Sequence, residues 1–352
     1  MGNGRNNEAR KEYQSDMKTT LAFKTDLKAA AAWGLIIGAL AWPGAAPGQD
    51  KKEPSPLVAA APLKLAGFSQ FLYTAWDKGV DGFNARRIRF SLGGELFKNV
   101  NYKIQVDAVK SPILIDALVE FKFSSAVGLR VGQFKVPFSM ENMTSSADLD
   151  TINRSQPEEK LTPGRDIGAN GRDIGAALFG KWSVLEYTLG VFNGSGINRN
   201  DINSEKDLGG RLVVRPAEFL AVGAAFYKGR TSVAAGSPAV DRDRTGLELA
   251  VLRGPLSLKS EYIFAKDDKL ERSGWYVQAG WSLMPAKLQV LLKLDAYNKA
   301  RQTSKDRMNL LTAGLNWFLT AKSKLQVNYE LYKLEGGKTD NSAFLVQLQA
   351  GF

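Results

Sequence analysis

Cysteine and histidine are both missing from this sequence of 352 residues. Without cysteine, the chain can form no disulfide bond and has no thiolate to offer to a metal ion or a substrate. Without histidine, it lacks the commonest metal ligand and the commonest general base of enzymes. No pair of carboxylates in an enclosed site can be named from the sequence in their place. We therefore expect a protein that is not an enzyme and that carries no cofactor.

The sequence also lacks an apolar run long enough to form a membrane-spanning helix. Its longest apolar run, residues 29–42, follows a basic segment and precedes small residues that end near Ala46. This order is typical of a secretory signal peptide, although a buried core helix is the alternative. We expect residues 1–46 to be an N-terminal extension and signal peptide, with translation starting at Met1 or Met17. Residues 47–62, which are rich in proline and alanine, are expected to be a periplasmic linker.

Acidic residues are scarcer than basic ones, with 36 Asp and Glu against 47 Lys and Arg, which gives a net charge of +11. A basic excess can indicate binding of nucleic acid, of an anionic membrane surface or of small anions. The basic residues are spread singly through apolar segments and form no patch with interleaved aromatic residues. Nucleic acid is therefore not an expected partner.

From residue 63 onward, apolar and polar residues alternate with a period of two. The last residues are an example, because Phe344, Leu348 and Phe352 share one face while Gln347 and Gln349 occupy the other. This alternation is typical of β-strands with one apolar and one polar face. We count sixteen such segments, which begin near residues 64, 85, 100, 113, 127, 171, 184, 207, 219, 243, 255, 272, 286, 306, 322 and 341.

The connections between these segments alternate between long and short, except that the link at 110–112 is short where a long one is due. An even number of antiparallel strands with short turns at one end and longer loops at the other is typical of an outer-membrane barrel. A soluble β-sandwich would need polar outer faces, whereas here aromatic and aliphatic residues recur on that face. Aromatic residues also gather near strand ends, where a membrane barrel has its girdles. They are Phe71, Tyr73, Trp76, Trp182, Trp275, Trp281, Trp317 and Phe318.

The sequence thus predicts an all-β fold, in which residues 63–352 form a 16-stranded antiparallel transmembrane β-barrel surrounded by outer-membrane lipids. The last strand would close the ring against the first, with Phe352 at the membrane boundary. A ring of sixteen strands is too wide for side chains to fill, so we expect a water-filled channel. The inward positions carry basic residues, among them Arg87, Arg89 and Lys103, but also acidic ones. Arg130 and Lys135 can both point inward only if the strand contains a bulge near Gly132 and Gln133.

Several segments resemble the phosphate-selective porin O/P family over roughly residues 63–352. They are RRIRFSLGGELFKNVNYKIQVD at 86–107, GLRVGQFKVPFSMENMTSS at 128–146, GVFNG at 190–194, GGRLVVRP at 209–216 and the doubled GRDIGA before a strand. The resemblance implies a trimeric outer-membrane diffusion channel whose solutes are small anions such as phosphate. It also implies that Phe352 is part of a C-terminal signal read by the outer-membrane assembly machinery. The residues that we expect along the anion path are Arg87, Arg89, Lys103, Arg130, Lys135 and Arg165.

The longest connection, about residues 139–170, is the third outer loop, which folds into the lumen in porins. We expect it to narrow the channel, with a short helix within residues 145–155, although a solvated surface loop is the alternative. A general, non-selective porin remains a second interpretation of the whole chain. A gated transporter would need a folded N-terminal plug, and a channel for hydrophobic substrates would need an apolar inward face; neither is evident in the sequence.

The signal-peptide interpretation can be tested on the membrane-embedded protein. We expect N-terminal sequencing to place the mature N-terminus near Pro47, because the apolar run ends just before the small residues that a signal peptidase requires. The mature protein should also migrate differently on a detergent gel before and after heating, as stable barrels do. Recovery of residues 29–42 in the membrane-embedded product would contradict the interpretation.

Overall fold

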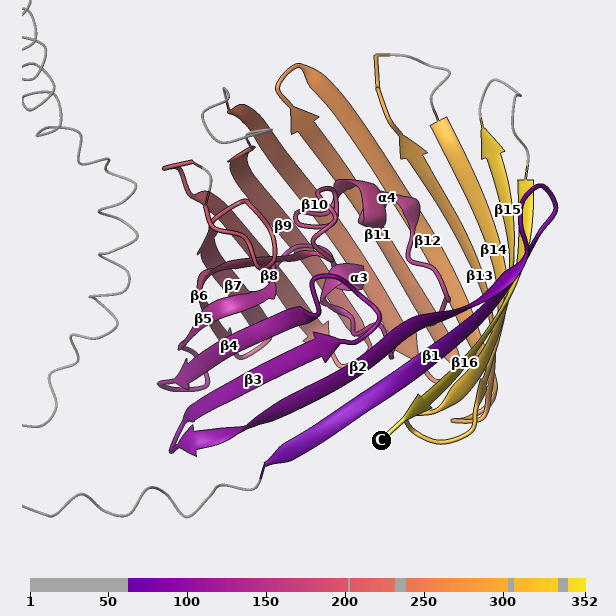
Figure 1. Ribbon diagram of the computed structural model, residues 1–352, viewed down its shortest axis with the longest axis horizontal. Coiled ribbons are helices and arrows are strands. Elements are labelled where there is room, and N and C mark those ends of the chain that lie inside the picture. The colour runs from indigo at the N-terminus through magenta and orange to yellow at the C-terminus, as the bar shows by residue number, and fades with distance from the viewer. Residues whose placement is uncertain (1–62, 202, 232–238, 303–306, 335–340) are drawn as a thin grey trace, which may run out of the picture. The chain divides into compact units, whose positions relative to one another are not determined.

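The computed structural model describes residues 63–352, except for 202, 232–238, 303–306 and 335–340. The expected signal peptide and linker, residues 1–62, lie outside the described residues. Sixteen antiparallel strands form a closed barrel in which each strand pairs with its neighbours in the sequence and β16 pairs with β1 (Figure 1). The strands are β1 (Lys64–Trp76), β2 (Gly82–Phe97), β3 (Val100–Asp107), β4 (Leu114–Lys122), β5 (Gly128–Lys135), β6 (Arg172–Trp182), β7 (Leu185–Phe192), β8 (Asp207–Ala217), β9 (Leu220–Thr231), β10 (Val240–Arg253), β11 (Leu256–Asp267), β12 (Leu270–Met284), β13 (Leu288–Asn298), β14 (Arg307–Phe318), β15 (Lys324–Leu334) and β16 (Asn341–Gly351).

The predicted number and order of strands are confirmed, and the largest error in a strand start is three residues, at β2 and β10. The alternation of long and short connections is less regular in the structure than the sequence predicts. The link between β11 and β12 consists only of Asp268 and Lys269, because these two strands continue beyond their predicted ends. In the described residues, no helix is long and apolar enough to cross a membrane.

Polar side chains are buried in this barrel and apolar ones are exposed, as β13 illustrates. Leu292 and Leu294 are 48% and 46% exposed, whereas the intervening Lys293 is 0% exposed and Asp295 is 2% exposed. In a water-soluble protein this arrangement would be strongly unfavourable, since the apolar side chains would face water and the charged ones would not. The distribution requires an apolar medium around the barrel and polar partners inside it.

The contact between β1 and β16 closes the ring, as the sequence predicts. The pairing runs from Phe68 opposite Gly351 to Trp76 opposite Ala343. Inside the ring the Gln70 amide donates to Gln349 Oε1 at 2.7 Å. Outside it, the ring of Phe352 lies so close to Gly67 that a Cβ atom there would be 2.7 Å from Phe352 Cζ. Glycine at position 67 is therefore what allows the terminal aromatic residue to lie against the wall.

Most of the predicted aromatic girdle lies on the outer face. Trp182 is 74% exposed, and Phe71, Trp281 and Trp317 are about half exposed. The prediction is wrong for Trp76, whose ring centre lies 5.8 Å from that of Tyr332 and which packs against a buried cluster that includes Ile152. Even-numbered positions of β1 point inward, so Trp76 lies on the side of the channel and not on the side of the lipid.

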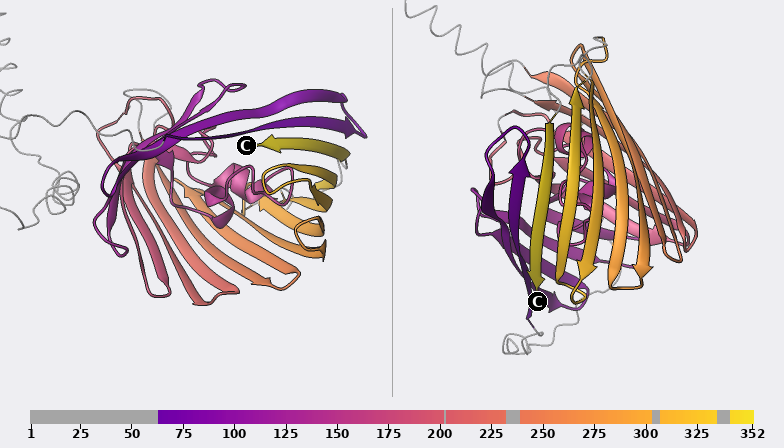
Figure 2. Two further views of the ribbon diagram at one scale, coloured as in Figure 1. Left: turned by 90° about the horizontal axis from the view of Figure 1, so that it is seen from below. Right: turned by 90° about the vertical axis from the view of Figure 1, so that its right-hand side faces the viewer.

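The connection between β5 and β6, residues 136–171, is the third outer loop and is called L3 below. It contains two short helices, α3 (Met140–Met143) and α4 (Gln156–Leu161), which lie within the ring of strands (Figure 2). The prediction of a helix within residues 145–155 is wrong. The structure has turns and bends there. The two helices flank this segment instead, and the hydroxyl of Ser139 caps α3 by accepting from the backbone N–H of Asn142 at 3.2 Å.

The inverted exposure pattern makes a testable prediction about stability. Changing Leu292 to Lys should lower the free energy of unfolding in phospholipid vesicles by about 2–4 kcal/mol, because the ammonium would face hydrocarbon near the middle of β13. The measurement is urea unfolding of the reconstituted barrel. As a control, Ser91→Lys introduces the same side chain beside an interior cavity and should cost far less. Equal destabilisation by the two changes would contradict the assignment of the two faces.

Candidate channel constriction

An apolar cluster inside the barrel attaches the two ends of L3 to one side of the wall. Phe134 near the end of β5, Val136 and Phe138 at the beginning of L3 and Leu161 in α4 are at most 2% exposed. They pack against inward residues of β6, β7, β9, β11 and β13, which are Ala177, Phe192, Ala225, Tyr227, Ile263, Ala265 and Tyr297. This cluster fills the space between L3 and that part of the wall, so water is excluded there.

The middle of L3 is held to β11–β15 by hydrogen bonds and one ion pair. Asp150 Oδ2 accepts from the Lys259 ammonium at 2.6 Å, and the Leu149 carbonyl accepts from the Lys324 ammonium, also at 2.6 Å. The Ile152 N–H donates to Asn328 Oδ1 at 2.7 Å. The inward polar side chains of this part of the wall are almost fully buried; they are Lys293, Thr312, Asn316, Gln326, Asn328 and Glu330. L3 therefore closes this half of the lumen as well.

Two further contacts fix the remaining parts of L3. The Asp166 carboxylate pairs with Arg242 and, at 2.8 Å, with Arg244, both on β10 and both 2% exposed. The Glu261 carboxylate on β11 accepts from the first two backbone N–H groups of α3, those of Met140 at 2.9 Å and Glu141 at 2.8 Å. A carboxylate at a helix N-terminus satisfies donors that have no partner within the helix.

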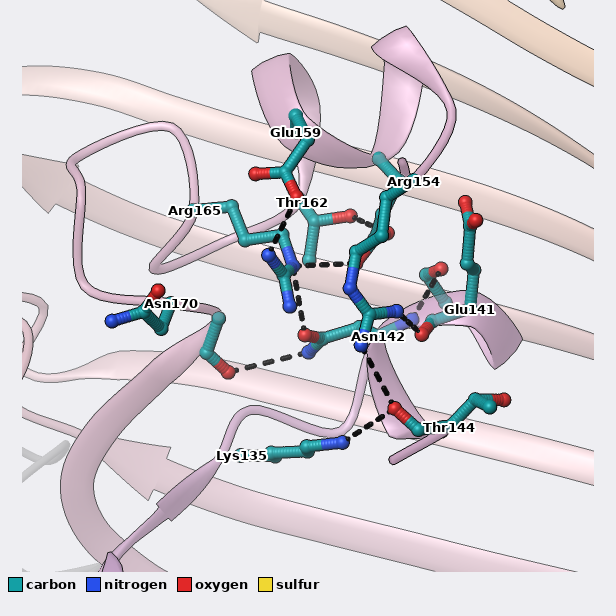
Figure 3. A network of polar contacts seen from close by, with 12 residues as sticks. Lys135, Glu141, Asn142, Thr144, Arg154, Glu159, Thr162, Arg165 and Asn170 are labelled. Atoms are coloured by element: carbon teal, nitrogen blue, oxygen red, sulfur yellow. Dashed lines mark hydrogen bonds and ion pairs between the residues drawn. The ribbon is translucent and has the colours of Figure 1, made fainter. Parts of the chain in front are cut away.

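Ion pairs and hydrogen bonds within L3 make the loop a compact unit (Figure 3). Arg165 lies 2.7 Å from Glu158 Oε1 and 3.0 Å from Glu159 Oε1. Burial opposes the charge of Arg165, but these two carboxylates outweigh that effect and raise the pKa of the guanidinium. Arg154 donates to the backbone carbonyls of Glu141 and Thr144. Burial and the nearby charge of Arg165 lower the pKa of Arg154 to about 10.

The open part of the lumen lies on the other side of L3, against β1–β5. A cavity of about 320 Å³ is bounded by Met143 and Ser145 of L3 and by inward residues of β3, β4 and β5. A second cavity of about 410 Å³ lies along β1, β2 and β3. The two cavities share Asn101, Tyr102 and Lys103. We call them together the cavity pair.

Three of the six residues expected along the anion path line the first cavity. Lys103 lies 2.9 Å from Asp116, and Arg130 lies 2.6 Å from Glu120. The Lys135 ammonium donates to the carbonyls of Met143 at 3.1 Å and Thr144 at 2.9 Å, so its partners belong to L3 and are uncharged.

The other three expected residues have different surroundings. Arg89 is 6% exposed and pairs with Asp107 at 2.9 Å, and Arg165 belongs to the network within L3 described above. Arg87 donates to Gln70 Oε1 at 2.8 Å. The structure therefore does not bring all six residues together around one opening.

A bulge in the wall adds an arginine that the sequence pattern did not reveal. The pairing of β1 with β2 shifts between Gln70 and Phe71, so Arg86 has no partner opposite it. Its side chain consequently points inward, like that of Arg87, and donates to Asn153 Oδ1 of L3 at 2.7 Å. Strict alternation would place two adjacent residues on opposite faces, and no residue in this stretch marks the bulge.

The bulge expected near Gly132 and Gln133 does not occur. The pairing of β5 with β4 and with β6 shows no shift of register there. The irregularity is one of conformation, since Gly132 has a φ of 124°, a value that side chains rarely permit. A Cβ atom on Gly132 would lie 2.2 Å from the Ala117 carbonyl oxygen. Glycine at this position is thus required for β5 to bring Arg130 and Lys135 to the same cavity.

Comparisons with solved structures define the fold. An OmpF of Salmonella typhi, solved in complex with daunomycin, superposes with a TM-score of 0.63 at 11% identity, covering 83% of this chain and 98% of that one. The in-vitro folded OmpT of Vibrio cholerae in its trimer form gives a TM-score of 0.57 at 11% identity, covering 83% and 100%. A mutant porin of Rh. blastica gives 0.52 at 12% identity, covering 83% and 100%. No curated protein sequence matches the chain.

A closed 16-stranded barrel with an apolar exterior, a polar interior and an internal loop defines the class of porins, which are channel proteins and not enzymes. Within that class, the sequence matches the family described as phosphate-selective porin O and P over residues 67–236 and 228–350. The chain belongs to this family, and it is a channel of the bacterial outer membrane.

The contacts of Asp166 predict how L3 can be released. In Asp166→Ala, two buried guanidinium groups lose their shared carboxylate. The free energy needed to detach the second half of L3 from β10 should therefore fall by about 3 kcal/mol. Cleavage by trypsin after Lys160 or Arg165 should then be about 100-fold faster, since the rate follows the population of the open state. The control is Asp201→Ala, which removes the carboxylate that pairs with the more exposed Lys206 and should leave these cleavage rates unchanged. Equal rates in both variants would show that Asp166 does not fix L3.

Proposed function

We propose that this porin lets small anions, phosphate or similar in charge, diffuse through the cavity pair between L3 and β1–β5. The observation that carries the proposal is the lining of the first cavity, where Lys103, Arg130 and Lys135 project from β3 and β5. The apolar cluster and the hydrogen bonds of L3 close the rest of the cross-section. A permeating solute must then pass these three cations.

The charges around the first cavity favour anions without excluding cations completely. Two carboxylates, Asp116 and Glu120, also line it. Asp116 is shared between Lys103 and Arg172, which lies 2.5 Å away, so it cannot neutralise both. Lys135 has backbone carbonyls as its partners, so no carboxylate is hydrogen-bonded to it. The balance around the opening is therefore positive by a small margin.

Confinement increases the effect of this margin. Water in a narrow passage screens charges less than bulk water does, and local potentials in such clefts reach several kT. A potential of that size concentrates anions at the constriction. The effect falls as salt is added, because the Debye length decreases from about 30 Å at 0.01 M to about 3 Å at 1 M.

In the proposal, Arg87, Arg89 and Arg165 do not contact the solute. They hold L3 and strand β2, which border the passage, in place. A solute that crosses the cavity pair would meet them only through the residues that they position. Their buried partners support this role, since Asp107 and Glu158 are among the least exposed carboxylates of the barrel interior.

The proposal includes the cellular setting of the channel. The chain would be exported through its N-terminal signal peptide, recognised by the outer-membrane assembly machinery through Phe352 and assembled as a homotrimer. The trimer form of the Vibrio cholerae OmpT, a protein of the same fold, supports the trimer. The exposed apolar face of the barrel supports contact with outer-membrane lipids wherever it is not covered by a neighbouring subunit.

The test of selectivity is a double change at the cavity, Lys103→Gln with Lys135→Gln. We expect the anion-to-cation permeability ratio, measured from reversal potentials in a planar bilayer under a salt gradient, to fall by about threefold or more at low salt. At 1 M salt the difference from the wild type should largely disappear. Reversing the charge at Arg89 is a less suitable test, because it would place a second carboxylate beside the buried Asp107.

The matched control is Lys266→Gln with Lys269→Gln, which removes the same charge from exposed positions away from the cavity pair. Both variants must show the heat-dependent gel mobility of an assembled barrel. If the control lowers the ratio as much as the cavity variant does, the net charge and not the cavity determines selectivity. If neither variant changes the ratio at low salt, the protein is a general, non-selective porin.

A further inference from the structure

Exposed cations lie in the short turns at one rim of the barrel or at the strand ends next to these turns. This short-turn rim carries the seven turns that join β2–β3, β4–β5, β6–β7, β8–β9, β10–β11, β12–β13 and β14–β15, and it is the rim at which β16 ends (Figure 2, right). In the turn β8–β9 the cation is Arg215, which lies 3.8 Å from Glu186. In the other six turns the structure shows no ion pair for the cation among the described residues; these cations are Lys98, Lys122, Lys181, Arg253, Lys287 and Lys322.

A large apolar side chain is exposed next to almost every one of these cations. Phe97 precedes Lys98, Phe123 follows Lys122 and Trp182 follows Lys181, and these three apolar residues are 50% to 74% exposed. The remaining turns have the same combination; their exposed apolar residues include Phe219, Leu252, Met284 and Leu319. The guanidinium of Arg253 lies 5.2 Å from the centre of the Phe219 ring. The unit that repeats around the rim is therefore an apolar side chain with a cation beside it.

The rim carries few carboxylates that could neutralise these cations. Among the described residues in or next to the seven turns, the carboxylates are Glu95, Glu186 and Glu218. The opposite rim differs, because its described loops and strand ends contain carboxylates as well as cations. Its carboxylates include Asp77, Asp81, Asp201, Glu205, Asp241 and Asp268. The positive charge is thus a property of one rim and not of the exposed surface in general.

The position of the repeated unit determines what it can meet. Among the exposed apolar residues, Phe123 and Trp182 continue the lipid-facing positions of β4 and β6, so they lie at the boundary of the hydrocarbon. Lys122 and Lys181 have the opposite orientation, but they lie at the ends of the same strands, where their long side chains reach the level of the lipid head groups. Neighbouring hairpins are on the order of 10 Å apart, since each contains two strands. That is about one Debye length at physiological salt, so each cation acts as a separate site.

We propose that the short-turn rim binds the phosphate groups of anionic phospholipids in the leaflet from which it emerges. Each apolar side chain would lie among the upper parts of the acyl chains, and the adjacent cation would pair with a head-group phosphate. A soluble anion would use the cations alone, whereas a lipid uses both halves of the unit. The inference concerns the outside of the barrel and does not depend on the anion preference of the channel.

The test compares lipid binding to the full mature protein and to a variant with four changes, Lys98→Gln, Lys122→Gln, Lys181→Gln and Lys287→Gln. The proteins are reconstituted in phosphatidylcholine vesicles with spin-labelled phosphatidylglycerol or spin-labelled phosphatidylcholine. The fraction of motionally restricted label gives the relative association constant of the two lipids. At low salt we expect the wild type to prefer phosphatidylglycerol by about fivefold, and the variant by less than twofold. In 1 M NaCl the preference of the wild type should nearly vanish.

The control variant removes four lysines from the opposite part of the barrel, Lys228→Gln, Lys266→Gln, Lys269→Gln and Lys299→Gln, and these residues are also exposed. It should keep the wild-type preference. Inorganic phosphate, added at constant ionic strength, should not displace the labelled lipid. The proposal is overturned if the wild type shows no preference, if the two variants lose it equally, or if free phosphate abolishes it. Gel mobility before and after heating establishes that each variant is assembled.

Discussion

Hydrocarbon offers no water to bind backbone N–H and C=O groups, and the barrel exists because its strands satisfy all of these groups in a closed ring. The decisive contact is the pairing of β1 with β16, which joins the two ends of the sheet and leaves no edge. Once the ring is closed, the inside and the outside face different media, and the period of two in each strand distributes polar and apolar side chains between them. The exposure of Leu292 beside the buried Lys293 is a direct consequence.

The closed ring creates a lumen that its own side chains cannot fill, and L3 determines how much of that lumen stays open. The loop is asymmetrically attached. Apolar packing around Phe138, hydrogen bonds around Asp150 and the ion pairs of Asp166 all hold it towards β6–β15. On the side of β3–β5, where the first cavity lies, the buried apolar contact is smaller and joins Ala169 of L3 with Ile115 of β4. The location of the cavities therefore follows from the location of the attachments.

Charge in this barrel has different physical roles at different depths. In the buried parts of L3, as at Arg165 and Glu158, opposite charges are paired because neither could remain buried alone. At the cavity the pairing is incomplete, and the Lys135 ammonium is hydrogen-bonded only to backbone carbonyls. At the short-turn rim the cations are exposed beside apolar residues. The net charge of +11 is thus a sum of contributions with different roles, and its size alone indicates none of them.

The features that depend on local periodicity could be predicted from the amino-acid sequence alone. Sixteen strands, the face to which Leu292 or Gln347 points, the closure by the C-terminal strand and the family could all be read from residues near one another in the chain. Strand period and turn composition are local properties, and the medium on each side of the wall selects the register. The identity of Lys103, Arg130 and Lys135 as inward cations follows from the same pattern, with the help of the family resemblance.

The folded barrel was needed to show which of these cations share a cavity, because that depends on contacts between residues far apart in the sequence. The direction of Arg86 results from a bulge that one strand forms against its neighbour, and no local pattern marks it. The inward direction of Trp76 becomes clear from its contacts with Tyr332 and Ile152. The segment 145–155 has capping residues that favour a helix, but its backbone groups bind the wall, as when the Leu149 carbonyl accepts from Lys324. Long-range hydrogen bonds outweighed the local preference there, and a sequence pattern contains no information about partners that lie 175 residues away.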